Sequence, residues 1–447
     1  FRSKSHLSYS IKFKTKQGKQ MLDYKFIKDN LEAVKENIKN RNMNADADKV
    51  VELYDKRTAL VTKQQDLQQQ RNENAKAMKQ KLDDAKRQEL IQAGKKIKED
   101  IAEVEKELAQ VEIDLDAAAR QIPNMIHPDA PIGKLDTENL EVKKVGTPRK
   151  FDFEPKDHVQ LAEELDLLDF DRGTKVSGPK FYYLKNEAVF LEQALIQYAL
   201  NILRKHGFEL FITPDVAREE ILKGIGFNPR GNESNVYSIE DEGTCLVATA
   251  EITLGGYHSG EILDKAKLPL MYGGLSHCFR REAGAAGQFS KGLYRVHQFD
   301  KVEMFVYSTP EQSDALHHKL REIEEEIFSG LGLPFHVVDT CSGDLGAPAY
   351  RKWDLEAWMP GRNGGEYGEV TSTSNCTDYQ ARRLNIKYKD DDGKNKYVHT
   401  LNGTAIAVGR AMLAILENYQ NEDGSVTIPP VLVPFCGFDK IGPKNKK

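Results

Sequence analysis

The stretch that decides the fold is residues 279–305, FRREAGAAGQFSKGLYRVHQFDKVEMF. Two strand-like runs flank a loop rich in glycine and alanine, so we expect two neighbouring strands. A planar Arg at a strand end can hold a phosphate through two hydrogen bonds, and an adjacent carboxylate can receive an exocyclic amine or an ammonium group. Arg280 and Glu282 therefore suit a nucleotide triphosphate site. An exposed Arg–Glu pair on a surface hairpin is the alternative.

A second segment, residues 400–420, reads TLNGTAIAVGRAMLAILENYQ. It predicts a strand end that enters an apolar helix, with Arg410 inside the apolar stretch. Because burying an unpaired guanidinium is costly, Arg410 must meet either a carboxylate of the protein or an anion brought by a ligand.

A third segment, residues 366–375, reads EYGEVTSTSN and predicts a strand. Glu369 and Ser372 lie close together on it, three residues apart. Carboxylate and hydroxyl oxygens are ligands that Mg²⁺ prefers, so this pair is a candidate metal site. On its own the pattern is weak, because Ser and Thr are common in strands.

Beyond these segments, the composition limits the class of protein. The 447 residues allow two or three folded units, and the net charge of −5 points to no particular partner. No run approaches the roughly 20 apolar residues that cross a bilayer, so we expect no membrane association. Five cysteines without a C-x-x-C pair argue against a disulfide framework. A zinc site at His277-Cys278 or His317-His318 lacks a spaced second pair.

The amino-acid composition changes near residue 125. Residues 21–122 contain no proline and only one glycine, Gly94, whereas all 17 prolines follow. The first part is typical of long helices, and the second predicts a mixed α+β domain, with a strand near 208–213 and a helix near 188–206.

Within the first part, apolar residues recur at heptad spacing and predict one seam of a coiled coil. They are Ile97, Ile101, Val104, Leu108, Val111, Leu115, Ala118 and Ile122. An upstream helix fits the same frame less regularly, with Val50, Leu53, Leu60, Leu67 and Met78 interrupted by Arg57, Gln64, Arg71 and Asn74. We therefore predict an antiparallel hairpin of two helices, each of about 35 residues, with a turn near residues 82–86.

Charge is uneven along this hairpin. Residues 71–98 carry nine basic and four acidic side chains, whereas residues 99–116 carry one basic and eight acidic ones. The positive end is suited to a polyanion, although a solvated helical surface with ordinary i,i+4 pairs is the favoured interpretation of a charge cluster on its own. The basic residues nearest the turn are Arg71, Lys76, Lys79, Lys81, Lys86 and Arg87.

The first twenty residues are basic, contain no acid and begin at Phe1. They are typical of the remnant of an import peptide, or of a cloning or fragment artefact. The first reading predicts a mitochondrial matrix or plastid stroma protein, and the alternative is the cytoplasm.

The three segments and the hairpin together resemble the class II aminoacyl-tRNA synthetases, and within them the bacterial-type seryl-tRNA synthetases. The resemblance runs from Met21 to about residue 435. It implies an α+β fold in which an antiparallel sheet with flanking helices follows a helical arm. It also implies three parts: a tail at 1–20, a tRNA-binding domain at 21–125 and a catalytic domain at 126–447. Residues 207–214 resemble the motif that forms the dimer interface, which implies a homodimer.

The resemblance also implies roles for individual residues. Arg280 would contact the α-phosphate and Arg410 the γ-phosphate of ATP, with Glu369 as a third residue of the reaction centre. The ATP site would comprise Arg280, Arg281, Glu282, Val296, Glu369, Val370, Thr371, Ser372 and Arg410, with Mg²⁺ on Glu369 and Ser372. The serine pocket would comprise Thr249, Ala250 and Glu251, in a strand-like run at 246–254, together with Glu303, Asn402 and Thr404.

The implied activity is the ATP-dependent ligation of L-serine to serine tRNA, and also to selenocysteine tRNA, through seryl-adenylate. The basic residues near the turn of the hairpin would grip the tRNA. Two other readings stay open: a synthetase-like paralogue that charges a carrier protein, and a non-catalytic coiled-coil binding protein.

Overall fold

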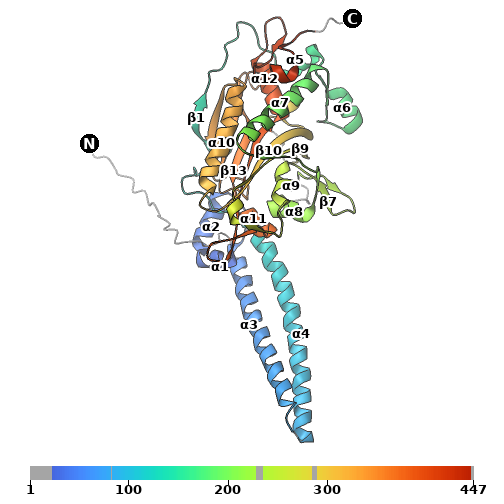
Figure 1. The fold of residues 1–447 in the computed structure, drawn as a ribbon, viewed down its shortest axis with the longest axis vertical. Helices are drawn as coiled ribbons and strands as arrows, with labels where there is room; N and C mark the ends of the chain where they lie inside the picture. Colours follow the sequence, from blue (N-terminus) through green and yellow to red (C-terminus); the bar gives the residue numbers. More distant parts are fainter. Residues whose placement is uncertain (1–22, 82, 228–234, 284–288, 444–447) are drawn as a thin grey trace, which may run out of the picture. The chain divides into compact units, whose positions relative to one another are not determined.

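The computed structural model describes residues 23–81, 83–227, 235–283 and 289–443 (Figure 1). The predicted import segment at 1–20 lies outside these residues. The described residues form two compact units, one within 23–35 and 45–122, the other within 36–44 and 123–443. Among the described residues, no helix is both long and apolar enough to cross a membrane.

The first unit is built on a hairpin of two long helices, α3 (Ala47–Ala77) and α4 (Asp84–Arg120). It also holds α1 (Tyr24–Asp29) and the first half of α2 (Leu31–Asn40). The predicted coiled-coil hairpin is confirmed, but α3 ends at Ala77 and α4 begins at Asp84, so the connection lies earlier than the predicted turn at 82–86. The reason is a helix cap: the Asp83 carboxylate accepts the Lys86 N–H at 2.7 Å and starts α4 there.

Both the apolar and the polar seam positions hold the hairpin together. Most of the predicted seam residues are buried: Val50, Leu53, Leu60, Leu67, Ile101, Val104, Val111, Leu115 and Ile122. The polar positions bond across the pair of helices instead. Arg57 Nε donates to Glu112 at 3.0 Å, and Gln64 Nε2 donates to Glu105 at 3.2 Å. Since the partner numbers fall as the first numbers rise, these bonds fix an antiparallel register.

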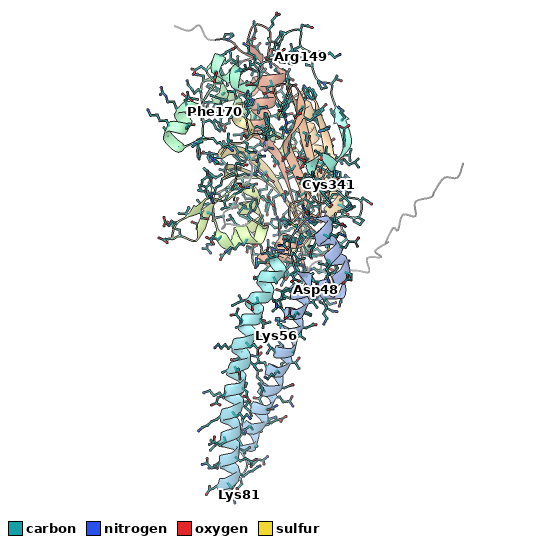
Figure 2. All side chains as sticks on the ribbon, turned by 180° about the vertical axis from the view of Figure 1, so that it is seen from behind. Asp48, Lys56, Lys81, Arg149, Phe170 and Cys341 are labelled. Atoms are coloured by element: carbon teal, nitrogen blue, oxygen red, sulfur yellow. The ribbon has the colours of Figure 1, made fainter. Side chains whose placement is uncertain are left out.

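The basic residues lie where α3 and α4 meet. Figure 2 shows Lys81 at the closed end of the hairpin, whereas Lys56, farther along α3, pairs with Glu107 at 2.8 Å. All six basic residues proposed from the sequence are exposed: Arg71, Lys76, Lys79, Lys81, Lys86 and Arg87. Their charges therefore face the solvent, where a polyanion could meet them, although Lys86 also pairs with Glu89 at 2.7 Å.

The second unit is built on an eight-stranded sheet, antiparallel except where β4 runs parallel to β9. Its order is β1 (Leu140–Val145), β11 (Phe335–Asp339), β12 (Arg351–Met359), β13 (Glu366–Asn375), β16 (His399–Ala407), β10 (Gln298–Ser308), β9 (Leu270–Phe279) and β4 (Glu209–Ile212). The predicted α+β fold is confirmed. The strands expected at 208–213 and 366–375 are present as β4 and β13, and the strand that enters a helix at 400–420 is present as β16 and α12. Of the two strand-like runs expected within 279–305, β10 forms the second, whereas the first lies almost wholly outside a strand because β9 ends at Phe279.

Strand alternation gives this sheet two different faces. On β10, Val302, Met304 and Val306 point into a large apolar core. That core includes residues of α7 (Glu187–Lys205), α10 (Ser313–Gly330) and α12 (Val408–Asn418), which Figure 1 shows along the sheet. Phe305 and Tyr307 point the other way, into a second cluster. Glu303 shares their face, so polar residues beside this cluster can form a site.

Shorter elements surround the sheet. The remaining helices are α5 (His158–Leu165), α6 (Phe170–Ser177), α8 (Glu219–Ile225), α9 (Ala250–Gly256), α11 (Tyr379–Leu384), α13 (Val433–Cys436) and the 3₁₀ turns η1 (Asp136–Glu138), η2 (Lys265–Lys267) and η3 (Gly292–Tyr294). The small sheets contain β2 (Leu168–Asp169), β3 (Tyr183–Leu184), β5 (Val216–Arg218), β6 (Ser238–Ile239), β7 (Thr244–Leu246), β8 (Ile262–Asp264), β14 (Lys387–Lys389), β15 (Asn395–Tyr397), β17 (Val426–Thr427) and β18 (Lys440–Ile441).

The strand-like run predicted at 246–254 is wrong, because β7 ends at Leu246 and α9 begins at Ala250. Thr249 caps this helix, its Oγ1 accepting the Glu251 N–H at 3.1 Å. The sequence misled because no residue of α9 is fully exposed. A short helix buried on most sides shows no polar stripe, so its apolar run resembles a strand.

Candidate active site

A cleft with a cavity volume of about 150 Å³ opens on the polar face of the sheet. It is lined from β10, β13, β16, the first turns of α9 and α12, and the segment between β9 and β10. The proposed site residues that line it are Thr249, Glu251, Arg280, Glu282, Val296, Glu303, Glu369, Val370, Thr371, Ser372, Asn402, Thr404 and Arg410. Residues spread over about 160 positions of sequence thus share one space.

Two of the proposed residues do not line this cleft. Ala250 is fully buried in α9. Arg281 is exposed, and its N–H donates to the Asn235 carbonyl at 2.9 Å. Since Arg281 is adjacent to Arg280 at the end of a strand, the two side chains leave the backbone in different directions.

At one end of the cleft, the Glu303 carboxylate is almost fully buried and surrounded by donors. It forms an ion pair with Lys301, which is also buried. The hydroxyls of Thr249 and Thr404 donate to the same Glu303 oxygen, at 3.4 and 3.3 Å. Such a charged, dry group is suited to a small hydroxyl-bearing ligand and would be left poorly paired by a ligand without a hydroxyl.

Glu251 adds a second carboxylate to this end. Its Oε1 accepts hydrogen bonds from Gln380 Nε2 at 2.8 Å and from Asn402 Nδ2 at 3.0 Å. Desolvation by burial and the nearby charge of Glu303 raise the pKa of Glu251 to about 7. A ligand ammonium placed beside these two carboxylates would relieve their repulsion, which makes this end a site for a small amino compound.

The middle of the cleft is suited to a nucleotide. Arg280 donates through Nε to the Ala248 carbonyl at 3.3 Å, and its guanidinium lies 5.3 Å from the centre of the Phe299 ring. Glu282 accepts a hydrogen bond from Arg295 at 2.6 Å and has φ +50, a left-handed conformation that is costly for a residue with a side chain. A planar base and a phosphate could be bound by this combination of an aromatic ring and cations.

At the other end, Arg410 meets the first of the two partners that the sequence left open, a carboxylate of the protein. Its Nη1 donates to the Glu369 carbonyl at 2.8 Å and lies 3.4 Å from the Glu369 carboxylate. Its guanidinium also rests 4.6 Å from the Tyr294 ring centre. The side chain is 20% exposed and lines the cleft, so it can also reach an anion there.

Glu369 and Ser372 share a face because β13 is irregular. Strict alternation would put residues three apart on opposite faces. Glu369 pairs with Glu356 and Thr371 with Leu355, which leaves Val370 as an extra residue in a β-bulge. Burial acts to raise the pKa of Glu369, but the charges of Arg410, Lys352 and Arg280 outweigh it and lower that pKa. An ionised carboxylate beside a hydroxyl fits a hard cation such as Mg²⁺.

The two histidine pairs considered for zinc lie outside the cleft lining. His277 pairs with Asp215 at 2.7 Å, and Cys278 is fully buried. His317 is buried with its ring stacked on Trp353, the ring centres 4.1 Å apart. Among the described residues, no group of three or more His, Cys, Asp or Glu side chains is placed to hold a metal ion.

Sequence reasoning missed two residues that shape the amino end of the cleft. Lys301 lies two positions before Glu303 on the same face of β10, so strand alternation alone could have found it. Gln380 gave no such signal. Its side chain is fully buried in α11, donates to Glu251, and accepts the Thr400 hydroxyl at 2.8 Å. The contact joins residues 129 positions apart, which no local pattern reveals.

Two family models match the chain. Residues 21–126 match the model described as the seryl-tRNA synthetase N-terminal domain. Residues 236–419 match the class II tRNA synthetase core domain shared by the G, H, P, S and T enzymes. The two matches cover the hairpin and most of the cleft, respectively.

Whole-chain comparisons with known proteins and solved structures also find serine–tRNA ligases, which are seryl-tRNA synthetases. The serine–tRNA ligase of Treponema denticola is 76% identical, over 94% of this chain and 100% of that protein. The serine–tRNA ligase of Borreliella burgdorferi is 57% identical, over 95% and 100%. A crystal structure of seryl-tRNA synthetase from Pyrococcus horikoshii complexed with ATP has a TM-score of 0.88 and 41% identity, covering 95% of this chain and 100% of that one.

Proposed function

Because the chain belongs to the seryl-tRNA synthetase family of class II aminoacyl-tRNA synthetases, we propose that it ligates L-serine to serine tRNA with ATP and Mg²⁺. The observation that carries the proposal is the single cleft that is lined both by the carboxylates Glu251 and Glu303 and by the guanidinium groups of Arg280 and Arg410. Such a cleft binds an amino acid and a nucleotide side by side. Selenocysteine tRNA, if it presents the same features, is a second substrate.

The two parts of the chain divide the work. We assign tRNA binding to residues 21–125 and catalysis to residues 126–447. The active form is a homodimer, supported by β4 at the edge of the sheet, where Leu210 and Ile212 are exposed, Ile212 to 84%. The bacterial relatives are compatible with a cytoplasmic enzyme, the second of the two predicted compartments.

The reaction needs no protein nucleophile. A serine carboxylate oxygen attacks the α-phosphorus of ATP, the bond from that phosphorus to the bridging oxygen of pyrophosphate breaks, and seryl-adenylate forms. Catalysis then depends on alignment and on neutralising phosphate charge. Arg280 addresses the α-phosphate and Arg410 the γ-phosphate. The terminal adenosine hydroxyl of the tRNA next attacks the carbonyl carbon, and AMP leaves.

The serine end fixes the amino acid through two groups. Thr249 and Glu251 receive the ammonium, while Glu303 and Thr404 receive the hydroxyl, with Asn402 beside them. Ala250 contributes only by packing α9. At the nucleotide end, Glu282 and Val296 hold the adenine against Phe299. Glu369 and Ser372 would hold Mg²⁺, which supplies positive charge to the phosphate oxygens when bound.

Serine-dependent exchange of pyrophosphate into ATP tests the proposed activation step. We expect exchange with serine, much less with threonine, and almost none with alanine. Charging of serine tRNA in the same preparation tests the second step. Exchange without tRNA charging would favour a carrier-protein paralogue, and absence of both reactions would contradict the proposal in favour of a binding protein.

The pKa of Glu251 predicts how serine binding depends on pH. A carboxyl with a pKa of about 7 is mostly protonated at pH 6 and mostly ionised at pH 8. Because the serine ammonium needs the ionised form, the KM for serine should fall about tenfold from pH 6 to pH 8. The KM for ATP, measured in the same exchange assay, serves as the internal control. A Glu251→Gln enzyme should bind serine poorly and lose this pH dependence.

The hairpin should contribute to tRNA charging but not to serine activation. Reversing charge at Lys79, Lys81, Lys86 and Arg87 should raise the KM for tRNA and reduce its salt dependence, because each lost phosphate contact removes close to one unit of the salt slope. Pyrophosphate exchange should not change. The single variant Lys81→Glu has a matched control in Lys106→Glu, which reverses an equally exposed charge in the acidic stretch and should leave the KM for tRNA unchanged.

Deleting residues 71–98 and closing the hairpin with a short turn should abolish charging while leaving exchange intact. The inner seam from Ile101 to Ile122 remains to hold the shortened hairpin together, and the second unit, which contains none of the deleted residues, should still fold. Unchanged tRNA charging by this shortened enzyme would show that the basic end is only a solvated helix surface.

A further inference from the structure

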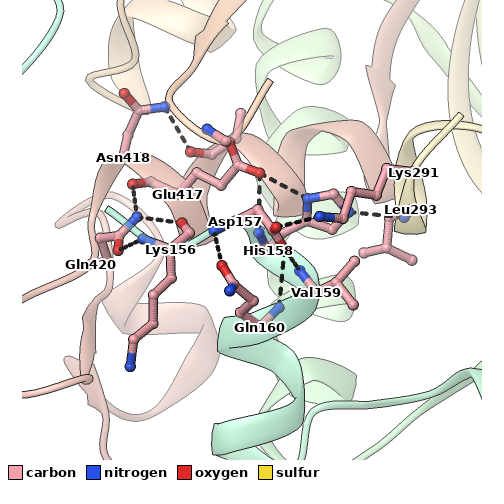
Figure 3. Close-up of polar contacts among 12 residues, drawn as sticks. Lys156, Asp157, His158, Val159, Gln160, Lys291, Leu293, Glu417, Asn418 and Gln420 are labelled. Carbon is pink, nitrogen blue, oxygen red and sulfur yellow. Dashed lines mark hydrogen bonds and ion pairs between the residues drawn. The ribbon is translucent and has the colours of Figure 1, made fainter. Parts of the chain in front are cut away.

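A buried histidine–carboxylate pair lies outside the residues that line the cleft. His158 begins α5 and Glu417 lies near the end of α12, and each is only 1% exposed. His158 Nδ1 lies 2.8 Å from Glu417 Oε1, as Figure 3 shows. The proposed reaction uses neither residue, so the energetic cost of burying them calls for a reason.

Hydrogen bonds define the protons of this pair. The Leu293 N–H donates to His158 Nε2 at 3.1 Å, so Nε2 is an acceptor and the ring proton sits on Nδ1. Nδ1 donates that proton to Glu417. Glu417 also accepts the His158 N–H at 3.1 Å and the Gly361 N–H at 2.7 Å. The carboxylate thus accepts three donors, and the imidazole is neutral with its acceptor aimed at Leu293.

The hydrogen bond from Leu293 connects His158 to the lining of the cleft. Leu293 and Tyr294 belong to η3, and both line the cleft. The Tyr294 carbonyl accepts a hydrogen bond from Arg410 Nε at 3.2 Å, and the Tyr294 ring lies against the same guanidinium. Arg410 and Glu417 are seven residues apart on α12 and so share one helix face. The η3 turn is therefore held from α12 twice, by Arg410 and through His158.

The turn fits against His158 because residue 292 is glycine. Gly292 has φ +55, and a Cβ there would lie 2.1 Å from His158 Nε2. Any side chain would push the turn away from the imidazole and lengthen the Leu293 bond. The close approach and the backbone conformation both require glycine at this position.

We propose that His158 is a positioning residue of the ATP site: its Nε2 holds the Leu293 N–H and thereby fixes the turn on which Arg410 rests. Glu417 keeps the imidazole in the tautomer that can accept. This inference rests on the proposed function, since it concerns how the same cleft binds ATP. It assigns no contact between His158 and a substrate.

Two substitutions of His158 separate its two hydrogen bonds. In asparagine the amide nitrogen stands close to where Nδ1 stands, so the donor to Glu417 is kept and the acceptor for Leu293 is lost. In glutamine the amide oxygen reaches close to Nε2, so the acceptor is kept and the donor is lost. We expect His158→Asn to raise the KM for ATP in serine-dependent pyrophosphate exchange about tenfold, with the KM for serine changed less than twofold. His158→Gln should restore most of the ATP affinity.

Two further measurements keep the test independent of folding defects. Hydrogen–deuterium exchange should be faster around Leu293 in the His158→Asn enzyme and unchanged in β13. Gly292→Ala leaves the His158–Glu417 pair intact and should raise the KM for ATP in the same way. If the Asn and Gln enzymes lose melting temperature and ATP affinity equally, or if the KM for ATP does not move, His158 is a packing residue only and the inference is overturned. If the unmodified enzyme instead showed no serine-dependent pyrophosphate exchange, the proposed function itself would be contradicted.

Discussion

The Glu303→Ala enzyme is expected to activate serine at least about 10²-fold more slowly, with little change in the KM for ATP. Glu303 is 2% exposed, pairs with Lys301, and is the group proposed to receive the serine hydroxyl. Losing a charge-assisted hydrogen bond in a dry site costs about 1.5–3 kcal/mol, and the substitution also leaves Lys301 without its counterion. The measurement is serine-dependent pyrophosphate exchange with both substrates varied.

Glu324→Gln is the matched control for the loss of a buried carboxyl. Glu324 is 1% exposed on α10, and burial holds its pKa well above its usual value. Because burial favours the neutral form of that carboxyl, glutamine replaces it with a group of similar shape, and pyrophosphate exchange should be unaffected. Near-normal exchange by the Glu303→Ala enzyme would refute the assignment of Glu303 to the serine pocket.

The Arg410→Ala enzyme is expected to require far more ATP and to lose about 10³-fold or more in kcat/KM for ATP. Arg410 is proposed to neutralise the γ-phosphate, and removing one preorganised group at a charge that must be stabilised costs about 10²–10³-fold in other enzymes. Here the substitution also removes the cation beside Tyr294 and the counterion of Glu369. ATP titration of exchange, run beside thermal melting, measures the two effects separately.

Arg362→Ala controls for the loss of an arginine at the same ring. The Arg362 guanidinium lies 4.8 Å from the Tyr294 ring centre, and Arg362 is not among the residues that line the cleft. Its loss should leave the KM for ATP nearly unchanged. If Arg410→Ala instead collapsed the melting temperature without altering the ATP dependence, Arg410 would be a structural partner of Glu369 and not a phosphate ligand.

Local periodicity predicted the backbone of this protein well. The heptad seam of the hairpin and the strand–helix order at residues 400–420 are both present in the structure, because each depends on residues close in sequence. The exceptions are instructive. At α9 the burial of most sides removed the polar stripe of a helix, and at the hairpin the cap at Asp83 decided where the turn ends.

For the candidate site, the sequence predicted the residues but not the contacts that hold them. Three residues proposed from the sequence, Arg280, Glu303 and Arg410, all line one cleft. How they are held could not be read from the sequence. The bulge at Val370 that turns Glu369 toward Ser372 depends on pairing between strands, which a single strand's sequence does not specify.

The sequence by itself determined the hairpin, its basic end, the order of strands and helices in three motifs, and the side chains that supply charge to the cleft. Only the tertiary structure decided what supports those side chains: Gln380 beneath Glu251, and His158 between Glu417 and the turn at Leu293. The physical reason is that secondary structure follows from side-chain patterns over a few turns. A buried polar contact between distant segments is specified by the packing that brings its partners together.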